Sequence, residues 1–293
     1  MTVASQPSHQ PISDDLRRWI VSQTEAGCGP EDLLTAMRAS GWADSVAMAA
    51  LEQTLRQRLA ELDAAPAATN ATGPASAVPE PDLAAAPAVL LAGGREVHVL
   101  ATMQQPRVVV FGGLLSDEEC NGLMALAEPR LMRSETVDNA TGGNEVNVAR
   151  TSDGMFFERG ETPLIGTIEQ RIAELLRWPV DHGEGLQVLR YRPGAEYRPH
   201  HDYFDPQHPG TARILQRGGQ RVGTLVMYLN TASGGGATTF PDAGLEVAPV
   251  RGNAVFFSYD RAHPDTRTLH GGAPVTAGEK WVATKWLREG VFV

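Results

Sequence analysis

The stretch YRPGAEYRPHHDYF, residues 191–204, places the adjacent histidines His200 and His201 directly before an aspartate. Short runs rich in β-branched and aromatic residues lie before and after it, which is typical of a fold made mainly of strands. Side chains in a strand alternate between its two faces, so His200 and Asp202 point to one face and His201 to the other. The sequence therefore predicts a half-site with one imidazole and one carboxylate, and His201 packs elsewhere.

A second histidine would complete a metal site. Two imidazoles and one carboxylate leave coordination positions of Fe(II) open, as catalysis requires. His263 and His270 are the candidates downstream. His263 precedes a proline and fits a loop, whereas His270 precedes a Gly-Gly turn. Lys280 follows at the start of the next predicted strand, which suits a hairpin that holds an imidazole and an ammonium over one cavity.

The same pair of residues has a simpler interpretation. An isolated H-x-D on a strand is more often a surface pair or a hydrogen-bonded core pair, because the pattern is short and false matches are common. The downstream residues decide between the two interpretations.

The chain divides into three parts by composition. Residues 1–63 contain three amphipathic segments with helix start and stop signals, and we expect a small all-α unit there. Residues 64–90 are rich in Ala and Pro with few large apolar groups, which predicts a linker. Residues 91–293 hold the strand-like runs and two helical segments, so we expect helices bracing a mainly antiparallel sheet or barrel.

The role of the helical unit stays open at this point. It is either an appendage for packing or self-association, or a module that recognises a substrate or partner and raises its effective concentration near the site.

Composition argues against several classes of function. A net charge of −10 and a pI near 5.3 disfavour sequence-independent binding to nucleic acid, which needs clustered Lys and Arg. No run approaches the roughly 18 apolar residues of a membrane span, and the first residues lack the pattern of a signal peptide, so we expect a cytoplasmic protein. The two cysteines, Cys28 and Cys120, lie far apart, so a metal would depend on His and carboxylate ligands.

Residues 191–290 resemble the catalytic core of the prolyl 4-hydroxylases, which are 2-oxoglutarate- and Fe(II)-dependent dioxygenases. The resemblance rests on Y-x-x-G-x-x-Y-x-x-H-x-D at 191–202, RVGTLVMYLN at 221–230, GGATTFP at 235–241 and the H-x9-K-W-x4-KWL pattern that follows. A weaker similarity extends upstream to PRVVVFGGLLSDEEC at 106–120 and VARTSDGMF at 148–156. None of it includes the helical unit.

The resemblance implies a double-stranded β-helix, the jelly-roll or cupin-like fold, for the catalytic domain. It implies that His200, Asp202 and His270 ligate iron. It also implies that Lys280 pairs with the distal carboxylate of 2-oxoglutarate, since a buried carboxylate requires a compensating charge.

Five further positions match the family less directly. Tyr191 and Thr238 match residues whose hydroxyls help to hold the cosubstrate. Tyr197 and Arg221 match residues that contact the peptide substrate. Arg288 lies at a position near the substrate where animal and algal relatives carry a histidine, which puts the peptide sequence, and proline itself, in question.

The activity implied is hydroxylation of a C–H bond, most simply C4 of a prolyl residue in a peptide or protein. It consumes O2 and decarboxylates 2-oxoglutarate to succinate and CO2, with ascorbate as the reductant. Two alternatives stay open: the same iron chemistry on another side chain, free amino acid or small metabolite, or a non-catalytic sensor or interaction module that binds metal or 2-oxoglutarate. Two polar loops, 133–149 and 205–220, are candidates for closing over a substrate.

Overall fold

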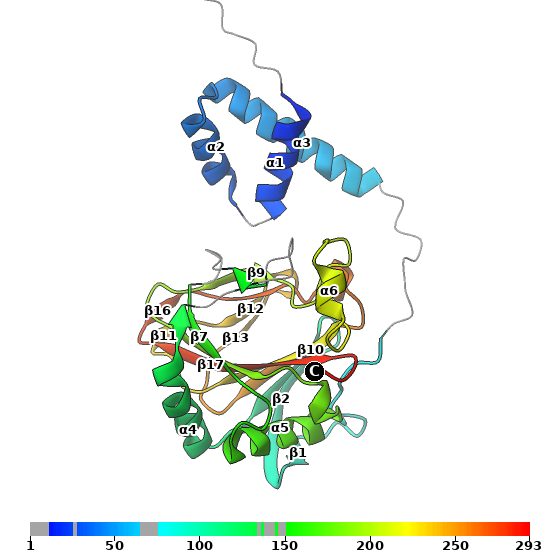
Figure 1. Cartoon of the computed structure of the whole chain (residues 1–293), viewed down its shortest axis with the longest axis vertical. Helices are drawn as coiled ribbons and strands as arrows, with labels where there is room; N and C mark the ends of the chain where they lie inside the picture. Colours follow the sequence, from blue (N-terminus) through cyan, green and yellow to red (C-terminus); the bar gives the residue numbers. More distant parts are fainter. Residues whose placement is uncertain (1–11, 26–27, 65–75, 134–135, 138–143, 146–150) are drawn as a thin grey trace, which may run out of the picture. The chain divides into compact units, whose positions relative to one another are not determined.

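The computed structural model describes residues 12–25, 28–64, 76–133, 136–137, 144–145 and 151–293. The chain divides into two compact units, Met1–Ala71 and Thr72–Val293 (Figure 1). Among the described residues, no helix has the length and apolar character needed to cross a membrane.

The first unit contains the three expected helices, α1 (Asp14–Glu25), α2 (Pro30–Ala39) and α3 (Asp44–Ala64). Helix α2 begins with a proline, and the Asp32 side chain accepts a hydrogen bond from the Gly29 N–H at 3.3 Å. The three helices share a small apolar core of Leu16, Ile20, Leu33, Met37, Ala47, Ala50 and Leu51.

The second unit holds all the described strands and three further α-helices. Its strands are, in chain order, β1 (Val89–Ala92), β2 (Arg95–Met103), β3 (Arg107–Gly112), β4 (Met132–Arg133), β5 (Thr136–Val137), β6 (Asn144–Glu145), β7 (Asp153–Phe157), β8 (Leu186–Tyr191), β9 (Tyr197–His200), β10 (Arg221–Tyr228), β11 (Gly234–Gly235), β12 (Thr238–Phe240), β13 (Leu245–Val247), β14 (Ala254–Ser258), β15 (His270–Gly272), β16 (Val275–Ala277) and β17 (Lys280–Arg288). Its α-helices are α4 (Asp117–Ala127), α5 (Pro163–Leu176) and α6 (Thr211–Leu215).

Most of these strands belong to two sheets, and the pairing of the described strands is antiparallel. The larger sheet has the order β1-β2-β3-β14-β10-β17-β8-β7-β4, and the smaller has the order β13-β12-β15-β9. Figure 1 shows α4 and α5 along one face of the larger sheet and the smaller sheet over the other face. Two facing antiparallel sheets braced by helices form the double-stranded β-helix, so the predicted fold is confirmed.

The two faces of the larger sheet pack into different cores. On β10, Leu225 and Met227 join Ile168 of α5 in one core, whereas Val226 and Tyr228 belong to the other. Successive side chains of a strand point to opposite faces, so a strand covered on both sides carries a nearly continuous apolar run. The second core lies between the sheets, where the site residues are found.

Helix α5 begins as its sequence predicts. The Thr162 hydroxyl accepts a hydrogen bond from the Ile165 N–H at 3.3 Å, and Pro163 takes the first helical position. Its buried apolar side chains, which include Ile168 and Ile172, cover the large sheet. Burial of each such side chain contributes about 1.5–3 kcal/mol to stability.

The predicted linker, residues 64–90, differs from the structure over its second half. The Glu80 carboxylate binds Arg107 of β3, and the Glu80 N–H donates to the Leu176 carbonyl at 2.9 Å. Pro79 lies so close to Gly223 that a β-carbon there would be 2.6 Å from the proline ring. These contacts order a segment whose Ala- and Pro-rich composition predicts a linker. Strand β1 then begins at Val89, inside the predicted linker.

The two predicted loops have different outcomes. Most of 133–149 lies outside the described residues. The loop 205–220 contains helix α6, and its closing over a substrate stays a prediction.

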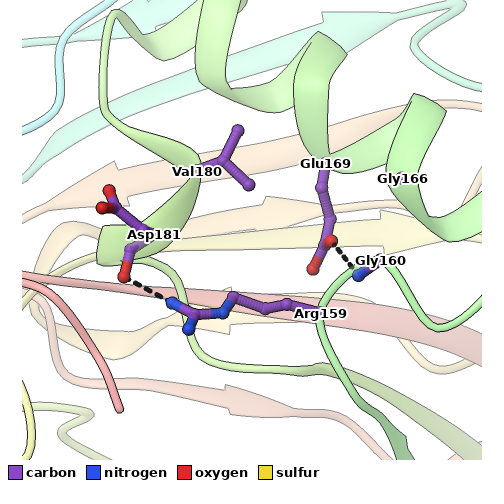
Figure 2. Close-up of a pocket in the computed structure, with 6 residues that line it drawn as sticks. All are labelled: Arg159, Gly160, Gly166, Glu169, Val180 and Asp181. Carbon is purple, nitrogen blue, oxygen red and sulfur yellow. Dashed lines mark hydrogen bonds between the residues drawn. The ribbon is translucent and has the colours of Figure 1, made fainter.

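One buried ion pair joins α5 to the large sheet. The Lys285 ammonium binds the Glu169 carboxylate at 2.5 Å and also donates to the Glu184 carbonyl. The other Glu169 oxygen accepts a hydrogen bond from the Gly160 N–H at 2.8 Å. Figure 2 shows this carboxylate at one side of a surface hollow, opposite Arg159, whose guanidinium donates to the Asp181 carbonyl. Both charges of the pair are fully used by the fold.

Removing one member of this pair should destabilise the second unit strongly. We expect Glu169→Ala to lower the free energy of unfolding by about 3–5 kcal/mol, because it leaves the Lys285 ammonium buried without compensation. The double variant Glu169→Leu with Lys285→Met removes both charges and should regain most of that loss. Urea unfolding followed by tryptophan fluorescence measures both, and a loss below about 1 kcal/mol for the single variant contradicts the account.

Candidate active site

Three of the predicted site residues lie together between the two sheets. His200 ends β9 and His270 begins β15, and the two histidines are direct partners in the pairing of these strands. Asp202 follows β9. Its Oδ1 lies 3.5 Å from Nε2 of His200, and its Oδ2 lies 3.4 Å from Nε2 of His270. One ligand atom from each residue falls within 4.8 Å of the others, which is close enough to hold one metal ion.

Backbone carbonyls fix the orientation of both imidazoles. Nδ1 of His200 lies 2.9 Å from the Arg198 carbonyl, and Nδ1 of His270 lies 3.0 Å from the Thr268 carbonyl. A carbonyl oxygen only accepts hydrogen bonds, so Nδ1 carries the proton in each ring. Each Nε2 lone pair is then free for a metal, which is the arrangement that ligating histidines require.

Burial and neighbouring charges set the protonation of the cluster. Burial lowers the pKa of His270 to about 4, so this imidazole is neutral near pH 7. For Asp202, burial opposes ionisation, but His270, His200 and Arg221 outweigh it and hold the pKa of this carboxyl well below its usual range. One carboxylate and two imidazoles form the donor set of the facial triad that binds Fe(II) with open positions. The residues present therefore fit an iron ion.

Lys280 provides a positive charge in the same cavity. It begins β17, lies opposite Tyr191 of β8 and is 4% exposed. Its ammonium has no ion pair or hydrogen bond with the described residues and lies 5.4 Å from the Tyr191 ring centroid. Burial lowers the pKa of Lys280 to about 8. A buried cation without a partner is costly until an anion joins it, so this part of the cavity suits a carboxylate.

The predicted hairpin between His270 and Lys280 is wrong. Strand β15 pairs with β9 and β12 in the smaller sheet, whereas β17 pairs with β10 and β8 in the larger one. The two residues line the same cavity from opposite sheets. Sequence spacing alone could not show this, because strands close in sequence cross between sheets in this fold.

The predicted cosubstrate residues also line the cavity. Tyr191 and Thr238 are both buried there, and the Thr238 hydroxyl accepts a hydrogen bond from the Tyr228 hydroxyl at 2.8 Å. Tyr228 was not singled out from the sequence. It lies on β10 two residues after Val226, which lines the cavity, so strand alternation places both side chains on the same face.

The predicted substrate residues fall into two groups. Tyr197 lines the cavity and stacks on His200, with ring centroids 3.7 Å apart. Arg221 and Arg288 are instead buried beside the cavity, and both bind the Glu184 carboxylate, at 2.6 Å and 2.7 Å. Neither is among the residues that line the cavity. Both arginines compensate a buried carboxylate, a role that the sequence does not reveal, and their contact with a substrate stays a prediction.

Trp286 connects this buried cluster to the cavity. The Arg221 guanidinium lies 4.0 Å from the Trp286 ring centroid, and the indole itself lines the cavity. His201 points elsewhere, as strand alternation predicts, and stacks on Tyr203 with centroids 4.6 Å apart. Sequence reasoning missed both Glu184 and Trp286, although Trp286 alternates with Thr284 and Val282 on the cavity face of β17.

Comparisons with known proteins agree on one family. The family model described as the 2OG-Fe(II) oxygenase superfamily matches residues 186–288. The chain is 41% identical over 209 residues to "Probable prolyl 4-hydroxylase 3" of Arabidopsis thaliana, covering 64% of this chain and 71% of that protein. It is 44% identical over 202 residues to "Prolyl 4-hydroxylase 1" of the same plant, covering 63% and 69%.

A solved structure gives a more distant match. The viral collagen prolyl hydroxylase of Paramecium Bursaria Chlorella virus-1, solved as a 2OG complex, aligns with a TM-score of 0.47 and 31% identity, covering 62% of this chain and 95% of that one.

The buried lysine predicts how binding of 2-oxoglutarate depends on pH. With its pKa at about 8, the Lys280 ammonium is protonated at neutral pH and loses its charge as the pH rises through 8. A carboxylate ligand favours the protonated form, so Kd should stay constant below about pH 7 and rise toward tenfold per unit well above pH 8. Calorimetric titration with Co(II) in the metal site measures this dependence. Lys280→Arg keeps its charge and should remove the dependence, whereas a constant wild-type Kd up to about pH 9.5 contradicts the account.

Proposed function

Because the chain belongs to the prolyl 4-hydroxylase family of 2-oxoglutarate- and Fe(II)-dependent oxygenases, we propose that it hydroxylates C4 of prolyl residues in a peptide or protein. Fe(II) is its metal and 2-oxoglutarate its cosubstrate, and ascorbate is the reductant typical of the family. The observation that carries the proposal is one cavity that holds His200, Asp202, His270 and the unpaired ammonium of Lys280.

Each group has a role in this chemistry. When bound, iron and 2-oxoglutarate supply the oxidising power that inserts one atom of O2 into a C–H bond, with release of succinate and CO2. His200, Asp202 and His270 hold the metal. Lys280 binds the distal carboxylate of 2-oxoglutarate, assisted by the hydroxyls of Tyr191 and Thr238. Apolar neighbours in the cavity, which include Leu189, Val226 and Val282, keep water away from the reacting atoms.

A peptide substrate is supported by aromatic side chains around the metal cluster. Tyr197 and Trp286 line the cavity, and a proline ring packs well on aromatic faces. The Trp286 indole N–H is buried and has no acceptor among the described residues, which suits a peptide carbonyl. Phe156 of β7 lies 6.3 Å from Trp286, centroid to centroid, and is 50% exposed. It extends the apolar surface beyond the cavity, as a peptide requires and a small metabolite does not.

The direct test is succinate formation from 2-oxoglutarate with Fe(II), ascorbate and a proline-rich peptide. We expect peptide-stimulated turnover in the wild type and its loss in His200→Ala, because the metal loses a ligand. We expect Phe156→Ala to raise KM for the peptide by about tenfold, since it removes an exposed aromatic contact, and to leave KM for 2-oxoglutarate unchanged.

Leu91→Ala is the matched control for Phe156. Leu91 is an apolar side chain of β1 that is 75% exposed and does not line the cavity. Wild-type turnover that the peptide does not stimulate indicates a different substrate, which is another side chain, a free amino acid or a small metabolite. Metal binding without any turnover revives the sensor or interaction module. The family comparisons favour neither of these alternatives.

For the first unit we propose a role in self-association or partner binding. The unit has an apolar core of its own, and Met48 on α3 is 57% exposed. Methionine is enriched at protein–protein interfaces relative to the rest of the protein surface. Sedimentation of the full chain should reveal an oligomer or a partner complex that Met48→Glu weakens, with activity on a short peptide unchanged. A chain that is monomeric and has the same activity and partners with either residue at this position contradicts the proposal.

A further inference from the structure

A series of hydrogen-bonded hydroxyl groups ends on the carboxylate of Asp202, one of the three predicted metal ligands. The Thr224 hydroxyl lies 2.8 Å from Oδ2 of Asp202, and the Tyr259 hydroxyl lies 3.0 Å from the Thr224 hydroxyl. All three side chains are deeply buried, with residue exposures of 7% for Asp202, 0% for Thr224 and 2% for Tyr259. Neither Thr224 nor Tyr259 is a ligand, and neither has a role in the function proposed above.

The hydrogen bonds that join these hydroxyl groups can run in only one direction. An ionised carboxylate only accepts hydrogen bonds, so the one hydroxyl proton of Thr224 points to Asp202. Thr224 then has no proton left for Tyr259, and the Tyr259 hydroxyl must be the donor in the second contact. The hydrogen bonds therefore run from Tyr259 through Thr224 to Oδ2 of Asp202. Bonds to an ionised acceptor are about twice as strong as neutral ones, so the last bond in the chain is the stronger one.

The hydrogen bonds among these three residues connect the two sheets. Thr224 lies on β10, in the middle of the larger sheet, and Tyr259 follows the neighbouring strand β14. Asp202 lies after β9, which belongs to the smaller sheet. A second contact, from the Arg221 guanidinium to the Asp202 carbonyl at 3.5 Å, holds the backbone of the same residue. Asp202 is therefore fixed to the large sheet through its side chain and through its main chain.

We propose that Thr224 and Tyr259 are positioning residues that hold Oδ2 of Asp202 and so present Oδ1 to the metal as a single ligand atom. The inference rests on the proposed function, because it assigns these residues to the iron site. A carboxylate that bound through both oxygens would occupy a position that 2-oxoglutarate or O2 needs. Partners that orient a metal ligand in this way commonly change metal affinity by 10–100-fold when they are removed.

The test measures metal binding separately from catalysis. Co(II) is titrated into the metal-free full chain and followed by its visible absorption, with wild type, Thr224→Val, Thr224→Ser and Tyr259→Phe. Thr224→Val keeps the shape of the side chain and removes the hydroxyl, and we expect its Kd for Co(II) to rise about 10–100-fold. Thr224→Ser keeps the hydroxyl and should bind nearly as wild type does. Tyr259→Phe should weaken binding less than Thr224→Val, since Thr224 still bonds to Asp202.

The absorption spectrum provides a second readout. If Thr224 directs Asp202 to bind through one oxygen, the Co(II) bands of Thr224→Val should change in position or intensity, whereas those of Thr224→Ser should not. Thr211→Val is the matched control, because the Thr211 hydroxyl is equally buried and donates to the Asp205 carbonyl instead of a ligand. We expect this control to bind Co(II) with wild-type affinity and spectrum.

The outcomes separate this inference from the function on which it rests. A wild-type chain that does not bind Co(II) contradicts both the proposed function and the inference. A wild-type chain that binds, with Thr224→Val within about twofold of it, overturns the inference alone. Equal weakening by Thr224→Val and Thr224→Ser also overturns it, because packing and not the hydroxyl would then be responsible. Metal-free thermal unfolding of each variant shows whether a loss of affinity is a loss of folding.

Discussion

The pairing of β9 with β15 is the constraint on which the site depends. It sets His200 directly opposite His270, and Asp202 follows on the same side as His200. Strands β9 and β15 are short, and the larger sheet supports their register from the opposite side. It does so through the core between the sheets and through the hydrogen bond from Thr224 to Asp202. The arrangement of the three predicted metal ligands therefore depends on the two sheets facing each other.

Several buried charged side chains outside the cavity have ion-pair partners, whereas Lys280 in the cavity has none among the described residues. Glu184 is compensated by Arg221 and Arg288, and Glu169 is compensated by Lys285. Only Lys280 combines deep burial with an ammonium that has no partner among the described residues. The sequence contains two lysines, so this contrast separates one structural lysine from one that awaits a ligand. Compensated charges stabilise the fold, and an uncompensated charge beside a metal cluster creates affinity for an anionic cosubstrate.

The sequence carried much of the site but only part of its surroundings. Strand alternation alone predicted that His200 and Asp202 share a face and that His201 does not. Spacing downstream indicated His270 and Lys280, and the family resemblance assigned their roles and added Tyr191 and Thr238; the structure brings all four to the cavity.

Contacts between residues far apart in the sequence could not be predicted. Arg221 and Arg288 share Glu184, which no local pattern connects to them. The hairpin expected for His270 failed for a similar reason, because adjacent strands of this fold alternate between sheets. The second half of the predicted linker is ordered by contacts with β3 and β10, which composition does not encode.

We propose that this cavity couples decarboxylation of 2-oxoglutarate to hydroxylation of a prolyl residue. Incubation of the full chain with a proline-containing peptide under ¹⁸O2, with mass spectrometry of the peptide and of succinate, tests this coupling. We expect one heavy oxygen atom in succinate and one on the prolyl ring, with the two labelled products formed in equal amounts. Labelled succinate beside an unmodified peptide, or peptide oxygen that comes from water, would contradict it.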